Sequence, residues 1–247
     1  MNPEIAIIAG FDSSGGAGLV VDGETVRALG GRPRFATTAL TAQTNDLGLA
    51  VEPSTASILE SQLRATFAHD LPRAIKIGML PNRQSATMVA SQLQALAPCP
   101  VVFDPVLQTS SGLSLMDDDC FEWIRAEFFS SVSLVTPNLF EASRFTGRKC
   151  EDRSDMVRVA EELLTLGAGA VLVKGGHLAE DFAPDCLLQR GMEPDWFETP
   201  RLTGFFRGTG CRLSSAIATR LAFGDDLHDA VGTAKAYLTD CLHQWAG

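Results

Sequence analysis

The chain alternates between short apolar segments, which are typical of strands, and longer segments with helical periodicity. Residues 5–9 form a continuous apolar run that ends at Gly10, as expected of a strand buried on both faces. Similar runs predict further strands at 34–40, 74–77, 101–103, 134–136 and 170–173, and one or two short strands within 185–199. Helices are predicted between them at 17–29, 54–68, 82–96, 117–128, 154–166, 211–223 and 226–244. This alternation predicts an α/β fold with a mostly parallel sheet covered by helices on both faces.

The helix predicted at 154–166 has the clearest end signals. Ser154 is a residue type preferred at the N-cap, and Gly167 follows the last position of the helical pattern. We therefore expect Ser154 to cap this helix.

A chain of 247 residues can bury most of its apolar surface, and single α/β domains often reach this length. Hydrophobic residues make up 45% and charged residues 20%, which predicts a folded single domain over 1–247. No segment approaches the roughly 20 apolar residues of a membrane span, and the N-terminus lacks the basic region of a signal peptide. The 6 cysteines include no Cys-x-x-Cys pair, which disfavours zinc and favours free thiols in a reducing compartment. We expect a cytoplasmic protein.

The charge balance limits the partners of this chain. It has 30 acidic and 20 basic residues, a formal net charge of −10. This argues against nucleic acid and against an anionic membrane surface, because both require clustered Lys and Arg. A small anionic ligand in a local site is not excluded.

Several predicted strands end in glycines or polar residues, and ligands of open α/β sheets bind beyond the carboxyl ends of the strands. The glycine-rich loop at 10–18 lacks the spacing of a dinucleotide fingerprint, and a tight turn is an equal interpretation of it. The absence of that fingerprint disfavours a dehydrogenase. The chain contains neither a Walker A loop nor a Gly-x-Ser-x-Gly elbow, and the missing elbow disfavours an α/β-hydrolase.

The segment Gly208-Thr209-Gly210-Cys211 opens the helix predicted at 211–223. Glycines at a helix start leave backbone N–H groups accessible to an anion, and the helix dipole adds favourable potential. Such a site can bind a phosphate or stabilise charge that develops during its transfer. A thiol here is expected to have a lowered pKa, which makes Cys211 a candidate base. The alternative is that Cys211 is a small buried residue.

Three further polar residues are candidates for phosphate and metal binding. Lys174 lies between an apolar strand and two glycines, where it is either a phosphate-binding charge or an exposed lysine. Asp104 and Glu141 can organise Mg²⁺, which prefers few carboxylates together with waters and phosphates. Alternatively, Asp104 forms a turn before Pro105 and Glu141 stabilises a helix N-terminus.

A series of motifs follows one family's order along the chain: Asp12-Ser-Ser-Gly-Gly-Ala-Gly18, Ala39-Leu-Thr-Ala-Gln43, Lys76-Ile-Gly-Met79, Asp104-Pro-Val106, Thr136-Pro-Asn138-Leu-Phe-Glu141-Ala142, Val173-Lys-Gly-Gly-His-Leu178, and Gly208-Thr-Gly-Cys211 with Leu213-Ser-Ser-Ala216. Together they resemble the ribokinase-like superfamily and, within it, the hydroxymethylpyrimidine/phosphomethylpyrimidine kinases of thiamine biosynthesis. The resemblance implies a three-layer α/β/α sandwich that transfers the γ-phosphoryl group of ATP to 4-amino-5-hydroxymethyl-2-methylpyrimidine and then to its monophosphate.

The resemblance also implies roles for individual residues. On the acceptor side, Gln43 would recognise the pyrimidine, within a pocket lined by Gly10, Asp22, Met79 and Val106. The nucleotide and Mg²⁺ would be bound by Lys174, Asn138, Thr209, Glu141 and Asp104. Gly208, Gly210 and Cys211 would form the anion hole, with Cys211 near the reacting hydroxyl. A homodimer is implied as well.

The chain departs from the family pattern at several positions. Phe11 replaces the usual Ser or Thr, Ser110 replaces a common Lys, and Phe205-Phe206-Arg207 replaces Asn-Thr-His. Loss of the Lys removes a phosphate-seeking charge, and Arg207 is a candidate to supply one to ATP. These changes leave open whether the monophosphate is an acceptor. They also leave open a related-alcohol kinase, such as a pyridoxal kinase, and a non-catalytic pyrimidine or nucleotide sensor.

Overall fold

The computed structural model describes residues 2–44, 46–68, 71–96, 98–109, 111–204 and 206–246. Ser110 and Phe205, two of the departures from the family pattern, lie outside these ranges. In the part of the chain that is described, no helix is both long and apolar enough to cross a bilayer.

One sheet runs through the molecule in the order β3-β2-β1-β4-β5-β6-β7-β8-β9. Its strands are β1 (Glu4–Asp12), β2 (Arg32–Gln43), β3 (Gly48–Pro53), β4 (Ala74–Ile77), β5 (Val101–Phe103), β6 (Leu134–Val135), β7 (Ala170–Lys174), β8 (Phe182–Gln189) and β9 (Asp195–Pro200). Pairing is parallel from β2 to β7, whereas β3, β8 and β9 pair antiparallel towards the two edges. The predicted mostly parallel sheet is confirmed.

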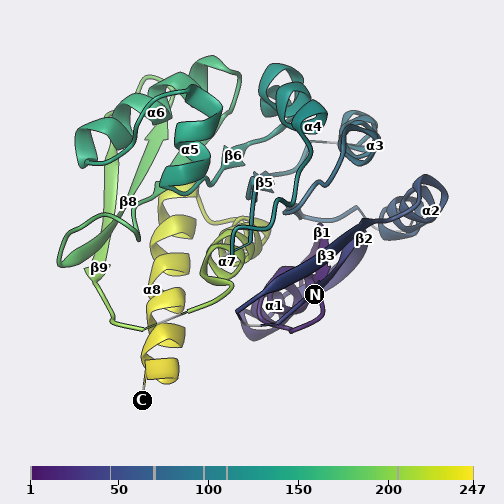
Figure 1. The fold of residues 1–247 in the computed structure, drawn as a ribbon, viewed down its shortest axis with the longest axis horizontal. Helices are drawn as coiled ribbons and strands as arrows, with labels where there is room; N and C mark the ends of the chain where they lie inside the picture. Colours follow the sequence, from purple (N-terminus) through teal and green to yellow (C-terminus); the bar gives the residue numbers. More distant parts are fainter. Residues whose placement is uncertain are drawn as a thin grey trace.

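Helices cover both faces of this sheet (Figure 1). One face carries α1 (Gly18–Ala28), α7 (Thr209–Phe223) and α8 (Leu227–Ala246); the other carries α2 (Ala56–Thr66), α3 (Arg83–Gln94), α4 (Asp118–Trp123), α5 (Leu139–Thr146) and α6 (Arg153–Thr165). Alternation along β1 explains the two layers, because Ile5 and Ile7 pack with the first set and Ala6 and Ile8 with the second. The predicted α/β/α sandwich is confirmed.

The start of α6 differs from the prediction. Its N-cap is Asp152, whose carboxylate accepts a hydrogen bond from the Asp155 N–H at 2.8 Å. The Ser154 hydroxyl donates to the same carboxylate, also at 2.8 Å. Ser154 therefore lies inside the helix, because the stronger charged acceptor two residues earlier takes the capping position.

Two elements, β3 and α5, were not predicted, and the helix expected at 117–128 is interrupted. Strand β3 is a six-residue edge strand, and α5 has only eight residues. Helix α4 ends at Trp123, and residues Ile124–Phe128 continue as a π-helix. Hydrophobic periodicity is a weak signal over such short elements, and it does not distinguish a π-helical turn from an α-helical one.

Candidate active site

A cavity of about 60 Å³ lies beyond the carboxyl ends of β1, β2 and β4. It brings together five of the predicted site residues, namely Gly10, Gln43, Met79, Val106 and Cys211. Phe11 and Lys76 also line it. These residues come from five separate segments: the parallel sheet brings the strand ends together, and α7 adds Cys211.

Close backbone approach explains the glycines on the first loop. A Cβ at Gly18 would lie 2.3 Å from the carbonyl oxygen of Gly10, and a Cβ at Gly10 would lie 2.8 Å from the Met79 sulfur. Gly18 also has a positive φ of 59°. The loop can therefore fold back over the end of β1 only because these positions lack side chains.

Asp22 does not line the cavity, contrary to the expectation. Asp22 belongs to α1, and its fully buried carboxylate accepts from both Lys76 Nζ, at 2.8 Å to each oxygen, and Ser215 Oγ at 2.8 Å. Burial acts to lower the pKa of Lys76, but the Asp22 carboxylate, with Cys211 and Asp104, holds it above its ordinary value. Lys76, for which the sequence suggested no role, therefore brings a buried charge to the cavity. Its signal was a lysine between Ile75 and Ile77 in an otherwise apolar strand.

The glycine-rich segment before α7 begins that helix without a side-chain cap. Gly208 is the N-cap with a φ of 68°, and a Cβ there would lie 2.4 Å from the carbonyl oxygen of Gly16. The first N–H groups of an α-helix have no partner within the helix. The N–H groups of Thr209, Gly210 and Cys211 therefore make the start of α7 suitable for binding an anion.

A second buried ion pair lies next to Gly210. Lys174 Nζ donates to Asp104 Oδ1 at 2.6 Å, and a Cβ at Gly210 would lie 3.0 Å from that nitrogen. Burial acts to lower the pKa of Lys174, but the carboxylates of Asp104 and Glu141 hold it above its ordinary value. A stable positive charge thus lies next to the start of α7.

Asn138 and Glu141 form a capping box at the start of α5. The Asn138 side chain accepts from the Glu141 N–H at 2.9 Å, and the Glu141 carboxylate accepts from the Asn138 N–H at 2.8 Å. Burial raises the pKa of Glu141 to about 7, although Lys174 acts in the opposite direction. The contacts of Glu141 therefore match the alternative interpretation, in which its charge stabilises a helix N-terminus.

The expected lowering of the Cys211 pKa is wrong. Burial raises the pKa of the Cys211 thiol to about 12, although Lys76 and a backbone hydrogen bond with Gly18 act in the opposite direction. Desolvation at the base of the cavity outweighs the favourable field at the helix start. The thiol is therefore neutral at physiological pH and is not a ready base.

Arg207 contacts loops on the acceptor side of the site. Its guanidinium donates to Ser14 Oγ at 2.8 Å and to the Thr44 carbonyl at 2.9 Å, and it pairs with Asp12 at 3.3 Å. These partners lie at the end of β1 and in the segments that follow β1 and β2.

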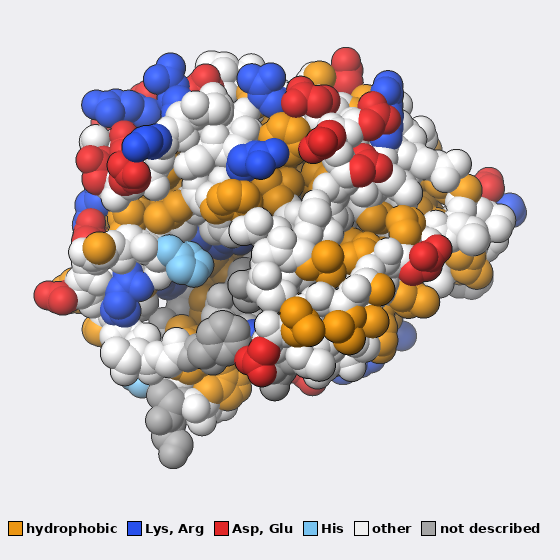
Figure 2. All heavy atoms as spheres, viewed as in Figure 1, with side chains coloured by type: hydrophobic (Ala, Val, Ile, Leu, Met, Phe, Trp, Pro, Cys, Tyr) orange, Lys and Arg blue, Asp and Glu red, His pale blue; other side chains and the backbone are white. Residues whose placement is uncertain are grey.

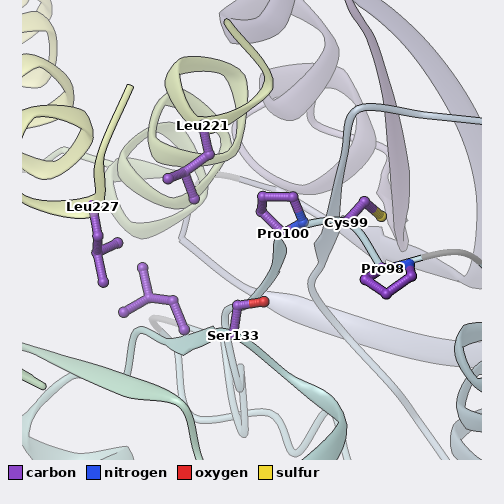
Figure 3. A pocket seen from close by; sticks show the side chains of 7 residues that line it. Pro98, Cys99, Pro100, Ser133, Leu221 and Leu227 are labelled. Carbon is purple, nitrogen blue, oxygen red and sulfur yellow. The ribbon is translucent and has the colours of Figure 1, made fainter. Parts of the chain in front are cut away.

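A larger cavity, of about 380 Å³, lies at the amino ends of β5 and β6, away from these groups (Figure 3). Pro98, Pro100, Leu221 and Leu227 line it, and none of its lining residues is charged. Phosphoryl and acid–base chemistry require charged or strongly polar groups. The smaller cavity is therefore the candidate active site.

Comparisons with known proteins match nearly the whole chain. The family model described as "Phosphomethylpyrimidine kinase" matches residues 12–246. A hydroxymethylpyrimidine/phosphomethylpyrimidine kinase of Rhizobium meliloti is 41% identical over 233 residues, which cover 94% of this chain and 87% of that protein.

Solved structures of kinases also match nearly the whole chain. A phosphomethylpyrimidine kinase from Clostridium difficile 630 has a TM-score of 0.84 and 35% identity, over 98% of this chain and 100% of that one. An ADP complex of Bacillus subtilis pyridoxal kinase has a TM-score of 0.89 and 29% identity, over 97% of this chain and 91% of that one.

Proposed function

The chain belongs to the phosphomethylpyrimidine kinase family, and from this premise we propose that it phosphorylates the hydroxymethyl group of 4-amino-5-hydroxymethyl-2-methylpyrimidine in thiamine biosynthesis. As a member of this family it is a kinase, with ATP as co-substrate. The observation that carries the choice of acceptor is that Gln43 and Cys211 line one cavity, with the glycine-rich start of α7 at its end. The monophosphate of the same pyrimidine is the proposed second acceptor.

The acceptor end of the cavity suits a small aminopyrimidine. A side-chain amide carries both donors and an acceptor, so Gln43 can pair with an amino group and a neighbouring ring nitrogen. Its amide nitrogen donates to Thr41 Oγ1 at 3.1 Å, which orients the group. Gly10, Met79 and Val106 supply the apolar walls. The acceptor hydroxyl would then point towards Cys211.

The phosphate end combines charge with exposed backbone N–H groups. Lys174 and the N–H groups of Thr209 and Gly210 would bind the ATP phosphates, with Asn138 beside Lys174 across an isolated β-bridge. Phosphoryl transfer depends mainly on positioning and on stabilising charge, so this arrangement supplies what the reaction needs. Gly208 and Gly210 act by allowing the backbone to approach the transferred group.

Glu141 and Asp104 are the residues that would hold Mg²⁺. Mg²⁺ commonly takes one or two carboxylates together with phosphate oxygens, and among the described residues no cluster of three or more His, Cys, Asp or Glu forms a closed metal site. The raised pKa of Glu141, which burial brings to about 7, is typical of a buried carboxylate that lacks full charge compensation. These residues therefore fit the ion. When bound, Mg²⁺ would neutralise charge on the phosphates.

Replacing Cys211 with Ala is expected to lower kcat about tenfold, the loss associated with one positioning hydrogen bond, while the KM for ATP changes little. Because burial raises the pKa of this thiol to about 12, wild-type kcat should show no thiol ionisation between about pH 7 and 9. Mass-spectrometric mapping after iodoacetamide treatment at pH 8 should find Cys211 alkylated more slowly than free cysteine. Wild-type turnover in Cys211→Ala would remove this residue from the mechanism.

A direct assay tests the proposed function. The protein is incubated with Mg-ATP and, separately, the hydroxymethylpyrimidine, its monophosphate or pyridoxal, and product masses are followed. We expect the monophosphate and then the diphosphate of the pyrimidine. No phosphorylation of either pyrimidine would overturn the proposal.

Pyridoxal phosphorylation is the second candidate function. The observation that favours it is the TM-score of 0.89 to a Bacillus subtilis pyridoxal kinase. The higher identity to pyrimidine kinases, 41% against 29%, argues for the pyrimidine. A kcat/KM for pyridoxal above that for the pyrimidine would reverse this preference.

A second copy of the chain is the proposed partner of the β2–β3 ribbon. Hydrophobic side chains gather over this edge of the sheet (Figure 2), and Leu40, Leu47 and Leu49 are each more than half exposed, at 55%, 55% and 62%. Clustered exposed aliphatic side chains at a sheet edge are typical of an interface. Sedimentation should give the mass of a dimer, and Leu49→Asp should shift it to that of a monomer. A wild-type monomer at micromolar concentration would contradict the proposal.

The proposed cellular setting follows from the thiols and the co-substrate. All six cysteines are free, as is usual in a reducing compartment. We place the protein in the cytoplasm as one kinase domain over 1–247.

A further inference from the structure

Arg207 joins three segments that surround the proposed active site. It directly precedes Gly208, the N-cap of α7, and its guanidinium reaches Ser14 on the loop after β1 and Thr44 after β2. Thr44 follows Gln43, the proposed acceptor-recognising residue. One side chain thus connects the anion-binding start of α7 to both acceptor-side segments.

The partners of Arg207 are themselves held in place. Asp12 is buried, and its first carboxylate oxygen accepts from the Ser14 N–H and Ser14 Oγ, each at 2.8 Å, which leaves the second oxygen for Arg207. Ser13 Oγ bonds the backbone N–H and carbonyl of Gln43 at 3.0 and 3.1 Å. Hydrogen bonds therefore connect the loop after β1, the end of β2 and the Arg207 guanidinium to one another.

We propose that Arg207 is a positioning residue that holds the Gln43 end of β2 in register with the glycine-rich start of α7. In this role it sets the distance between the acceptor-binding group and the phosphate-binding loop, and so determines where the acceptor hydroxyl meets the phosphoryl group. The inference rests on the proposed function. It differs from a phosphate-binding role, because the observed partners of Arg207 are two acceptor-side segments and a buried carboxylate.

The geometry requires a guanidinium rather than any cation. A planar fork can donate to Ser14, the Thr44 carbonyl and Asp12 at the same time, whereas an ammonium is a compact point charge. Arg207→Lys therefore keeps the positive charge but removes the planar set of donors. Arg207→Gln removes both. Arg220→Gln is the matched control, since Arg220 lies near the opposite end of α7 and pairs with Asp225.

Steady-state kinetics with the pyrimidine and Mg-ATP test the proposal. We expect Arg207→Gln to raise the acceptor KM about tenfold or more, the loss typical of hydrogen bonds from a charged group. The KM for ATP should stay within twofold, and Arg207→Lys should resemble Arg207→Gln. Gln43→Ala should show the same pattern as a reference for lost acceptor binding, and Arg220→Gln should match wild type. A raised KM for ATP with an unchanged acceptor KM, restored by Arg207→Lys, would assign Arg207 to the phosphates and overturn the proposal.

Hydrogen exchange without substrates distinguishes this inference from the proposed function. Peptides covering 12–18 and 41–50 should exchange faster in Arg207→Gln than in wild type or Arg220→Gln, because the connecting bonds are lost. Unchanged exchange in both segments would overturn the positioning role. If wild type phosphorylates no pyrimidine, the acceptor assignment fails, while the exchange comparison still decides whether Arg207 holds these segments together.

Discussion

Replacing Lys76 with Met is expected to lower the free energy of unfolding by about 3–5 kcal/mol, the usual cost of breaking a buried ion pair from one side. Both side chains of the pair have no solvent exposure, and Lys76 Nζ donates to both Asp22 oxygens at 2.8 Å. Without Lys76, the Asp22 carboxylate keeps only the 2.8 Å bond from Ser215 and must be buried ionised or take up a proton. The melting temperature should therefore fall by about 6–20 °C for a chain of this length.

The double variant Lys76→Met/Asp22→Leu provides the control. Replacing a buried pair with apolar residues of similar size often costs little, because the desolvation of both charges is also removed. The double variant should thus be more stable than Lys76→Met alone. A melting temperature of Lys76→Met within about 2 °C of wild type would show that Asp22 does not depend on this lysine for its charge.

Gly208→Ala is expected to lower kcat about a hundredfold, the loss seen when one preorganised donor for developing charge is displaced. The new Cβ would lie 2.4 Å from the Gly16 carbonyl oxygen, and the φ of 68° is unfavourable for any residue with a side chain. The start of α7 and the loop after β1 must therefore move apart. Initial-rate measurements with saturating Mg-ATP and pyrimidine check this loss.

Gly224→Ala separates backbone strain from crowding. Gly224 ends the same helix with a φ of 100°, but a Cβ there would meet no atom within 4 Å. It should lower stability through backbone strain alone, by less than Gly208→Ala does, and leave kcat near the wild-type value. If Gly208→Ala retained kcat within threefold of wild type, the start of α7 would not be the group that stabilises the transferred phosphoryl.

Much of the candidate site was predictable because its residues follow strands directly. Gln43 ends β2, Met79 follows β4 and Val106 follows β5, so a correct strand assignment in a parallel sheet places them at one edge. Their presence around one cavity matches this expectation. The short α5 was missed although Asn138 and Glu141 have the spacing of a capping box.

The contacts of Asp22 and Arg207 could not be predicted from the sequence. Asp22 lies 54 residues before Lys76 and 193 before Ser215, and Arg207 lies 195 residues after Asp12. Hydrogen-bond partners at such separations leave no local pattern, because periodicity and capping report only on residues a few positions apart. The sequence showed two charged residues near family motifs. The packing of α1, β4 and α7 gave Asp22 its partners, whereas those of Arg207 come from the end of β1, the loop after it and the segment after β2.

The amino-acid sequence by itself determined the layered α/β fold, the glycines that permit close backbone approach, and the family to which the chain belongs. Strand and helix periodicity and glycine conformation are local properties, so they can be predicted from neighbouring residues. Only the tertiary structure decided that the Cys211 thiol has its pKa raised to about 12 and that Lys76 stays paired with Asp22. These charge states depend on desolvation and on charges from distant segments, and both exist only once the sheet and its two helical layers have packed.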